Sequence, residues 1–270
     1  MIAQRLAPVG TPRHERLFNL VKSLDKIEEY KPLSWFAVWI MFAAGISAHA
    51  GSVDRFSFWD FSRWLPGLTG LTVWTVVYAR FLRSKSWFNF PNLSAKVNTL
   101  IPHLIVAELI FLSGWFTLSL ESLGTGLTYL LSYTALILVF TIPIETDEKS
   151  GKKRIPDSSY RLRIVISGAV LLTVSMLLGI GSDDPVLSTA AVVALPFYIV
   201  AFFDNHVRHV QRLRFYPAFI FGGFIASREA WFFLAALGLF YFLRHYYYFR
   251  LGIIHPSFGV DHDDPFPEAS

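Results

Sequence analysis

The 270-residue sequence contains no cysteine, and charged residues make up only 16% of it. The lack of cysteine excludes disulfide bonds and thiolate chemistry. A soluble domain carries roughly 25% charged residues, so the low charge argues against a soluble globular protein. The first long apolar run begins only near Leu33, after a charged segment. A cleavable signal peptide would begin earlier, so we expect the N-terminal segment to be retained.

Apolar and aromatic residues are correspondingly abundant. Hydrophobic residues, the aromatic ones included, make up 53% of the chain, and aromatic residues alone make up 17%. The hydrophobic residues are concentrated in runs such as 127–144 and 164–180. These runs approach the roughly 20 apolar residues that a helix needs to cross about 30 Å of hydrocarbon. The composition therefore predicts an integral membrane protein that forms one helical bundle.

Eight apolar segments divide the chain. They cover residues 33–53, 64–82, 99–119, 124–144, 161–181, 185–203, 213–227 and 230–249. The connections after the even-numbered segments are rich in Lys and Arg, whereas the others are short and poor in bases, as in "LESLG" and "GSDDP". Because Lys and Arg mark the cytoplasmic side, we predict an all-α, polytopic transmembrane bundle of about eight spans with both termini cytoplasmic.

Three regions are expected along the chain. Residues 1–32 form a cytoplasmic N-terminal segment, in which the apolar spacing over 14–30 predicts an amphipathic helix on the membrane surface. Residues 33–250 form the transmembrane helical domain, and residues 251–270 form an acidic cytoplasmic tail. Segment 213–227 is short for a crossing, so a re-entrant segment is the alternative there.

Ionisable residues inside the apolar segments are few, so each is a candidate for function. Glu108 lies near the middle of the third segment, where a carboxyl group must be paired, protonated or facing an internal cavity. A structural hydrogen bond between helices explains it equally well. His206 and His209 are spaced like a metal-binding pair, although packing at the membrane interface is the favoured interpretation. His49 and His103 are expected at different depths, which argues against a haem site.

The polar connection "TIPIETDEKSGKKRIP" (141–156) combines an acidic and a basic cluster. Mg²⁺ is usually bound through one or two carboxylates together with substrate phosphates, and Lys and Arg bind phosphate oxygens directly. The charges therefore fit a diphosphate site. On charge alone, an ordinary cytoplasmic loop is the favoured interpretation.

The sequence from Ile144 to Gly168 resembles the second aspartate-rich region of the UbiA superfamily of intramembrane prenyltransferases. That region has the form D-x-x-x-D-x-x-x-G-K-x-T-x-P. Asp147 matches its second aspartate, Gly151 and Lys152 match its Gly-Lys pair, and Pro156 matches its proline. The resemblance covers about 25 residues and implies a helical bundle with a cytoplasmic active site.

Two departures from the family pattern are visible. Pro143 stands at the leading aspartate position and Arg154 at the threonine position. The family's first aspartate-rich region should follow the second span, but residues 78–98 contain Asn89, Asn92 and a third asparagine without any carboxylate. The chain is thus expected to be either a divergent member with a reduced site or a relative that has lost catalysis.

The resemblance implies transfer of a prenyl group from an isoprenoid diphosphate to a small acceptor, with assistance from Mg²⁺. The residues that it implicates fall into three groups, namely catalytic carboxylates Asp147 and Glu145, diphosphate-binding residues Lys152, Lys153 and Arg154, and metal ligands Asp147, Glu148 and Asp204. The expected partners are membrane lipid or isoprenoid diphosphate and other membrane proteins, but no nucleic acid. A bacterial inner membrane is the expected location.

Two further functions remain as alternatives to prenyl transfer. One is a catalytically inactive, UbiA-like subunit or lipid-binding scaffold of a membrane complex, which the missing carboxylates after the second span favour. The other, less favoured, is a transporter that uses Glu108. The sequence has no convincing inverted repeat of the kind that transporters show.

Overall fold

The computed structural model describes residues 2–26, 30–88, 93, 95–146, 153–203 and 206–253. The chain is almost entirely helical in these ranges. The helices are α1 (Ile2–Leu6), α2 (Pro12–Lys22), α4 (Pro32–Val53), α5 (Trp64–Val77), α6 (Val97–Trp115), α7 (Leu120–Leu138), α8 (Ser158–Gly181), α9 (Pro185–Phe203), α10 (Val207–Arg228) and α11 (Ala230–Leu251). Short helical turns at Tyr78–Leu82, Ser86–Phe88 and Val139–Thr141 extend or follow them, and the strands β1 (Glu145–Thr146) and β2 (Lys153–Arg154) form a small hairpin.

Five of these helices are long and apolar enough to cross a membrane. They are Ser34–Val53, Val97–Trp115, Leu120–Thr141, Ser158–Gly181 and Pro185–Phe203. Each of the eight apolar segments predicted from sequence also overlaps a helix over most of its length. The predicted all-helical membrane class is therefore confirmed.

Local sequence explains where several helices begin. Ser119 and Ser122 form a reciprocal capping box at the start of α7, and the side chain of Asp157 accepts a hydrogen bond from Tyr160 N at the start of α8. Asp184 accepts hydrogen bonds from the first amides of α9 through one carboxylate oxygen. Such caps satisfy amide groups that have no partner within the helix.

Helix α10 differs from its sequence prediction. It extends without interruption over 22 residues, whereas only 213–227 was predicted as apolar and a re-entrant segment was considered. Arg208 and Arg212, which precede the predicted segment, and Arg214, at its start, all lie in the first half of this helix. His206 caps it, because its Nδ1 accepts a hydrogen bond from Arg208 N at 3.1 Å.

The N-terminal helix α2 is also shorter than predicted, since it ends at Lys22 rather than near residue 30. It packs against α11. The Tyr248 hydroxyl donates to Ala7 O at 2.8 Å, and Arg250 binds the Asp25 carboxylate at 2.6 and 2.8 Å. These contacts attach the N-terminal segment to the last helix.

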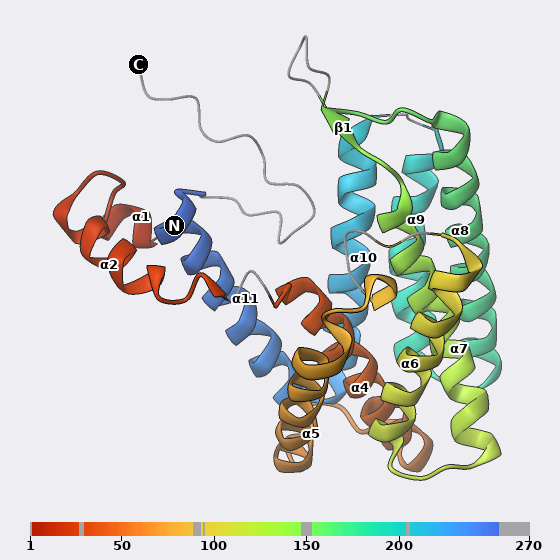
Figure 1. Cartoon of the computed structure of the whole chain (residues 1–270). Helices are drawn as coiled ribbons and strands as arrows, with labels where there is room; N and C mark the ends of the chain where they lie inside the picture. Colours follow the sequence, from red (N-terminus) through yellow and green to blue (C-terminus); the bar gives the residue numbers. More distant parts are fainter. Residues whose placement is uncertain are drawn as a thin grey trace.

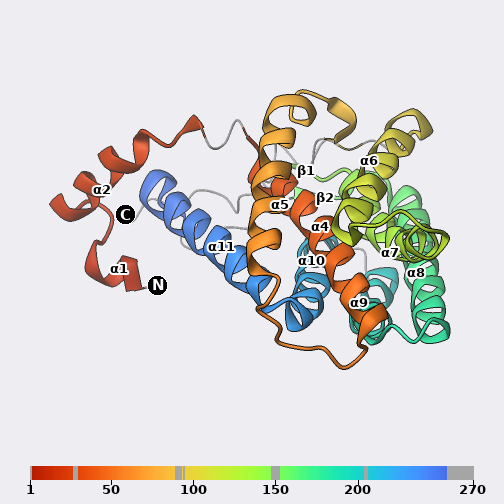
Figure 2. The same ribbon diagram turned by 90° about the horizontal axis from the view of Figure 1, so that it is seen from below.

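The helices are arranged around α4, α7, α9 and α10, with α6 and α8 packed beside them (Figure 1). Helix α11 leans away from this bundle and carries α1 and α2 at its far end, which Figure 2 shows from below. We call the end of the bundle with β1 and β2 the hairpin end. The opposite end, with connections 54–63, 116–119, 182–184 and residue 229, is called the turn end (lower end of Figure 1).

Helices α4 and α6 touch through glycines. A Cβ atom on Gly45 would lie 2.0 Å from Phe111 O, and one on Gly114 would lie 2.2 Å from Phe42 O. Small residues of this kind allow membrane helices to approach each other closely. The glycine pair therefore fixes the distance between α4 and α6.

Candidate functional site

The described ends of the predicted diphosphate loop form the paired strands β1 and β2. In their antiparallel ladder Glu145 is opposite Arg154, and Thr146 is opposite Lys153. The Glu145 carboxylate lies 3.9 Å from the Arg154 guanidinium, and both side chains are more than half exposed. An exposed pair of this kind contributes at most about 1 kcal/mol, so a phosphate ligand can displace it at little cost.

The remaining predicted ligands in this region lie outside the described residues. These are Asp147, Glu148, Lys152, Asp204, Asn89 and Asn92. Of the predicted diphosphate and metal site, the structure thus places Glu145, Lys153 and Arg154. Within the described ranges, no group of three or more His, Asp or Glu side chains is arranged to hold a metal ion.

A groove at the hairpin end combines an apolar wall with basic side chains. Its volume is about 150 Å³, and it lies between Pro196, Phe197 and Val200 of α9 and His209 and Arg212 of α10. The wall suits a hydrocarbon chain, and the arginine suits an anionic headgroup. The His206 and His209 rings lie near each other, with centroids 6.2 Å apart.

Two other basic residues at the hairpin end are buried and fix the backbone. Arg214 donates from Nε to Val139 O at 3.3 Å and from Nη2 to Ile142 O. Arg161 donates to Ala201 O. These guanidinium groups hold the chain that leads into the hairpin and the end of α9, which a count of basic residues in the sequence could not reveal.

Inside the bundle, the polar groups have different surroundings. His103 is fully buried and contacts Trp87 O at 3.0 Å and the Tyr133 hydroxyl at 2.8 Å, which gives it a structural role. Both carboxyl oxygens of Glu108 are buried without a hydrogen-bond partner in the described structure, and they lie against Gly126 of α7. The cavity between α4, α7 and α10 measures only about 20 Å³, enough for about one water molecule.

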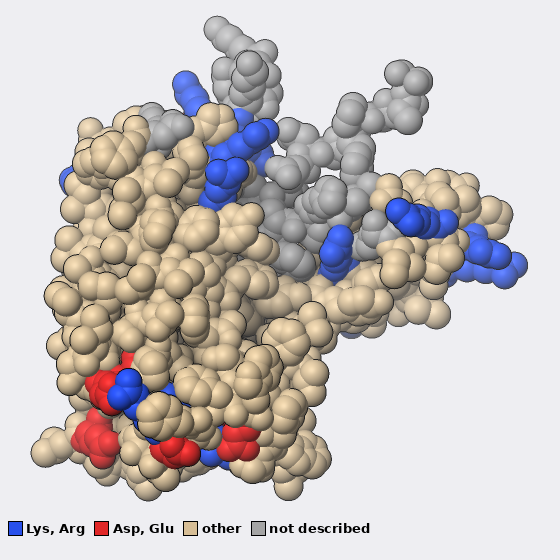
Figure 3. All heavy atoms as spheres, turned by 180° about the vertical axis from the view of Figure 1, so that it is seen from behind, with Lys and Arg blue, Asp and Glu red and all other residues tan. Residues whose placement is uncertain are grey.

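The turn end holds a second concentration of charge, which the sequence predictions did not include. Acidic side chains gather at this end in Figure 3, whereas basic side chains are prominent towards the hairpin end and on the α1–α2 arm. Glu229 is fully buried and accepts from Arg63 Nη2 at 2.7 Å and from Trp231 Nε1 at 2.7 Å. Arg228, its neighbour, is also buried, at 1% exposure.

Backbone hydrogen bonds hold the loop 54–63 against this charged cluster. Trp59 N donates to Ser227 O at 2.8 Å, and Asp60 N donates to Arg228 O at 3.1 Å. Ala230 N returns a hydrogen bond to Asp60 O at 3.2 Å. The turn between α10 and α11 is therefore built together with a loop from the first third of the chain.

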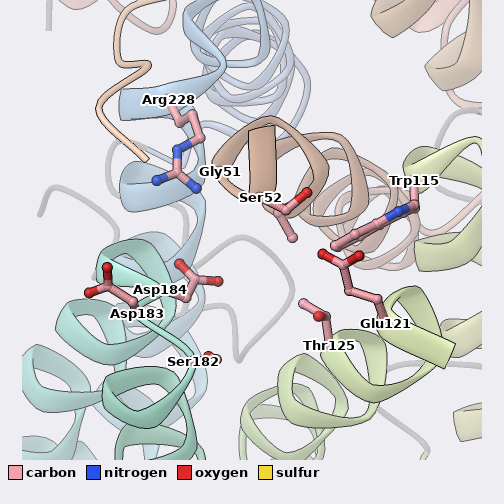
Figure 4. A pocket seen from close by; sticks show the side chains of 10 residues that line it. Gly51, Ser52, Trp115, Glu121, Thr125, Ser182, Asp183, Asp184 and Arg228 are labelled. Atoms are coloured by element: carbon pink, nitrogen blue, oxygen red, sulfur yellow. The ribbon is translucent and has the colours of Figure 1, made fainter. Parts of the chain in front are cut away.

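A polar pocket of about 270 Å³ opens beside this cluster (Figure 4). It is lined by the end of α4, Trp115 of α6, Glu121 and Thr125 of α7, the α8–α9 turn with Asp183 and Asp184, and Arg228 of α10. The sequence contained one signal for it. The charged pairs in "SDDP" and "SREA" stand where short connections between apolar segments need no charge.

Compared with known protein families, curated proteins and solved structures, the chain matches none of them.

Proposed function

We propose that the chain is an integral membrane protein with eight spans and both termini on the cytoplasmic face, located in a bacterial inner membrane. The correspondence of all eight apolar segments with helices supports the count. The basic hairpin end and the acidic turn end support the orientation, because Lys and Arg are enriched on the cytoplasmic side (Figure 3).

The cysteine-free sequence makes this topology directly testable. Ser182→Cys places a thiol at the exposed turn end, and Arg154→Cys places one at the exposed hairpin end. A membrane-impermeant maleimide should label the Ser182→Cys variant in intact cells and the Arg154→Cys variant only after the membrane is disrupted. The reverse pattern would overturn the orientation.

We further propose that the hairpin end binds the phosphate groups of an isoprenoid diphosphate. The observation that carries this proposal is the groove between α9 and α10, where an apolar wall meets His209 and Arg212. The half-buried Lys153 and the exposed Arg154 of β2 add positive charge at the same end. An isoprenoid diphosphate has the matching chemistry, a long hydrocarbon chain attached to an anionic head.

In its catalytic form this proposal follows the resemblance to the UbiA superfamily. Asp147, Glu148 and Asp204 would hold Mg²⁺, which would neutralise charge on the departing diphosphate. Lys152, Lys153 and Arg154 would bind the diphosphate oxygens and orient it. The prenyl group would then pass to a small acceptor.

Equilibrium binding of geranylgeranyl diphosphate to the purified protein tests the proposal. Binding should be stronger with Mg²⁺ than with a chelator, and Arg212→Gln should weaken it about tenfold, the effect of losing one charge-assisted hydrogen bond. Arg208→Gln is the matched control, because Arg208 is exposed one turn earlier on α10 and does not line the groove. Equal binding by both variants would contradict the groove assignment.

Prenyl transfer needs its own test. Asp147→Ala should abolish product formation while the protein still folds and remains monodisperse in detergent. Unchanged turnover in this variant would refute the catalytic assignment of Asp147.

A lipid-binding scaffold without catalysis is the second candidate. The cavity between α4, α7 and α10 is too small for an isoprenoid chain. This argues against prenyl transfer inside the bundle and favours lipid binding at the groove without catalysis. Geranylgeranyl diphosphate would then bind independently of Mg²⁺ and of Asp147, yet still depend on Arg212. This outcome separates the scaffold from the enzyme.

A further inference from the structure

The polar pocket at the turn end contains a buried cation, Arg228, that has no acidic partner among the described residues. Arg228 donates from Nη1 to Ser47 O and from Nη2 to Arg55 O, both at 3.1 Å, while its Nε has no partner in the described structure. Within the described part of the chain, no carboxylate lies within 4.0 Å of its guanidinium group. A buried charge without a counter-ion is costly, so the pocket favours an anionic group beside Arg228.

The neighbouring residues pack closely around the Arg228 guanidinium group. A Cβ atom on Gly51 would lie 2.0 Å from Nη1, so α4 passes Arg228 where it carries no side chain. The ring of Phe58 lies 5.2 Å from the guanidinium carbon on another side. These contacts restrain the Arg228 side chain, which lies at the edge of the pocket next to Gly51 (Figure 4).

The pocket also carries carboxylates, which exclude a purely anionic ligand. Asp184 has a structural role, since it caps α9 and accepts a hydrogen bond from the Tyr129 hydroxyl at 2.8 Å. Asp183 forms an exposed ion pair with Arg55. Glu121, in the first turn of α7, is exposed and makes no ion pair in the described structure.

Glu121 and Trp115 lie together across the pocket from Arg228 (Figure 4). A carboxylate beside an indole ring is a favourable environment for an ammonium group, through charge attraction and cation–π interaction. One side of the pocket therefore suits an anion and the other side suits an ammonium group.

We propose that this pocket binds a phosphoethanolamine group, with the phosphate on Arg228 and the ammonium group between Glu121 and Trp115. The volume of about 270 Å³ suits a small headgroup. The lining residues come from helix ends and short connections, which is the level of a phospholipid headgroup when the long apolar helices cross the bilayer. A phosphatidylethanolamine headgroup and free phosphoethanolamine share this chemistry.

Native mass spectrometry of the full chain in detergent tests the proposal. Phosphatidylethanolamine should bind at least about tenfold more tightly than phosphatidylglycerol, which lacks the ammonium group. Glu121→Gln should remove most of this preference, whereas Asp54→Asn, a change at the same end outside the pocket, should preserve it. Equal binding of both lipids by the wild type would overturn the proposal.

A second variant tests the phosphate side of the pocket. Arg228→Lys keeps the positive charge but loses the planar fork, so it should weaken binding of phosphatidylethanolamine several-fold while melting is still cooperative. If this variant does not fold, the lipid preference of Glu121→Gln is the measurement that tests the proposal. Unchanged lipid preference in Glu121→Gln would then overturn the proposal.

Competition identifies the natural source of the ligand. Displacement of the lipid by millimolar free phosphoethanolamine supports a site for a soluble ligand. Failure to displace it, together with loss of the lipid preference in Glu121→Gln, supports a lipid site. Both results support recognition of a phosphoethanolamine group. If neither the lipid nor free phosphoethanolamine binds, the proposal is refuted.

Discussion

Arg63 and Glu229 form an ion pair across 166 residues of sequence, with Arg63 Nη2 2.7 Å from Glu229 Oε1 and Nε 3.1 Å from the same oxygen. The Glu229 side chain is completely buried, while the Arg63 side chain is 27% exposed. Because Trp231 Nε1 donates to the other carboxylate oxygen, Glu229 is held from two sides. The pair joins the loop between α4 and α5 to the turn between α10 and α11, and Arg228 of the polar pocket lies directly beside it.

Removal of Arg63 should therefore destabilise the protein strongly. Arg63→Ala leaves a buried carboxylate without its cation, and such changes cost about 3 kcal/mol or more. Unfolding titrations in sodium dodecyl sulfate measure this change. Arg55→Ala is the matched control from the same loop. Both side chains of the Arg55–Asp183 ion pair are exposed, so loss of this pair should cost less than about 1 kcal/mol of stability. Similar losses in the two variants would contradict the importance of the buried pair.

The same loop should give the protein a stability change at acid pH. The backbone N–H of Ser62 donates to Asp60 at 2.6 Å, and this hydrogen bond lowers the pKa of the Asp60 carboxyl below its ordinary value of 3.8. The stabilisation is present above the ordinary pKa and is lost as the pH falls through the lowered value. In Asp60→Asn, the melting temperature should change less than in the wild type when the pH is lowered from about 5 to about 3. An identical pH dependence in both proteins would argue against this contribution.

The helices were predictable from the sequence because each apolar segment needs only its own residues to identify it. Segments 33–53 and 185–203 match α4 and α9 to within one residue at each end. Helix α10 was underestimated because its first turns carry arginines. Arg214 satisfies the carbonyls of Val139 and Ile142, and this long-range contact makes a charged residue compatible with a packed helix.

The polar pocket could not be predicted in the same way. Glu121, Asp184 and Arg228 are separated by 63 and 44 positions, and each stands beside a short connection that looks like an ordinary loop. Their proximity depends on how α7, α9 and α10 pack at the turn end. The polar connection that contains the hairpin was easier to recognise, since Glu145 and Arg154 are close in sequence.

Close glycine packing between α4 and α6 gives another prediction. Gly45→Ala places a methyl group 2.0 Å from the Phe111 carbonyl oxygen, a backbone atom that cannot move without shifting α6. Overpacking of this kind costs about 1–3 kcal/mol, and we expect a lower melting temperature in detergent. Gly238→Ala in α11 meets no atom within 4 Å and should leave the melting temperature unchanged or slightly higher. Equal melting temperatures for the two variants would show that the helices separate easily.

Glu108 gives the last prediction, because its carboxyl oxygens are buried between α6 and α7 without a partner in the described structure. Glu108→Leu removes this unsatisfied group and fills the same space, so stability should be equal to or greater than that of the wild type. Glu108→Gln is the matched control, since it keeps the shape and a polar group and should change stability little. A marked loss of stability in Glu108→Leu would mean that the carboxyl group forms a structural hydrogen bond. If both variants fold but Glu108→Gln abolishes proton-coupled uptake into proteoliposomes, the unpaired carboxyl group serves transport, and the less favoured transporter hypothesis replaces the lipid-binding one.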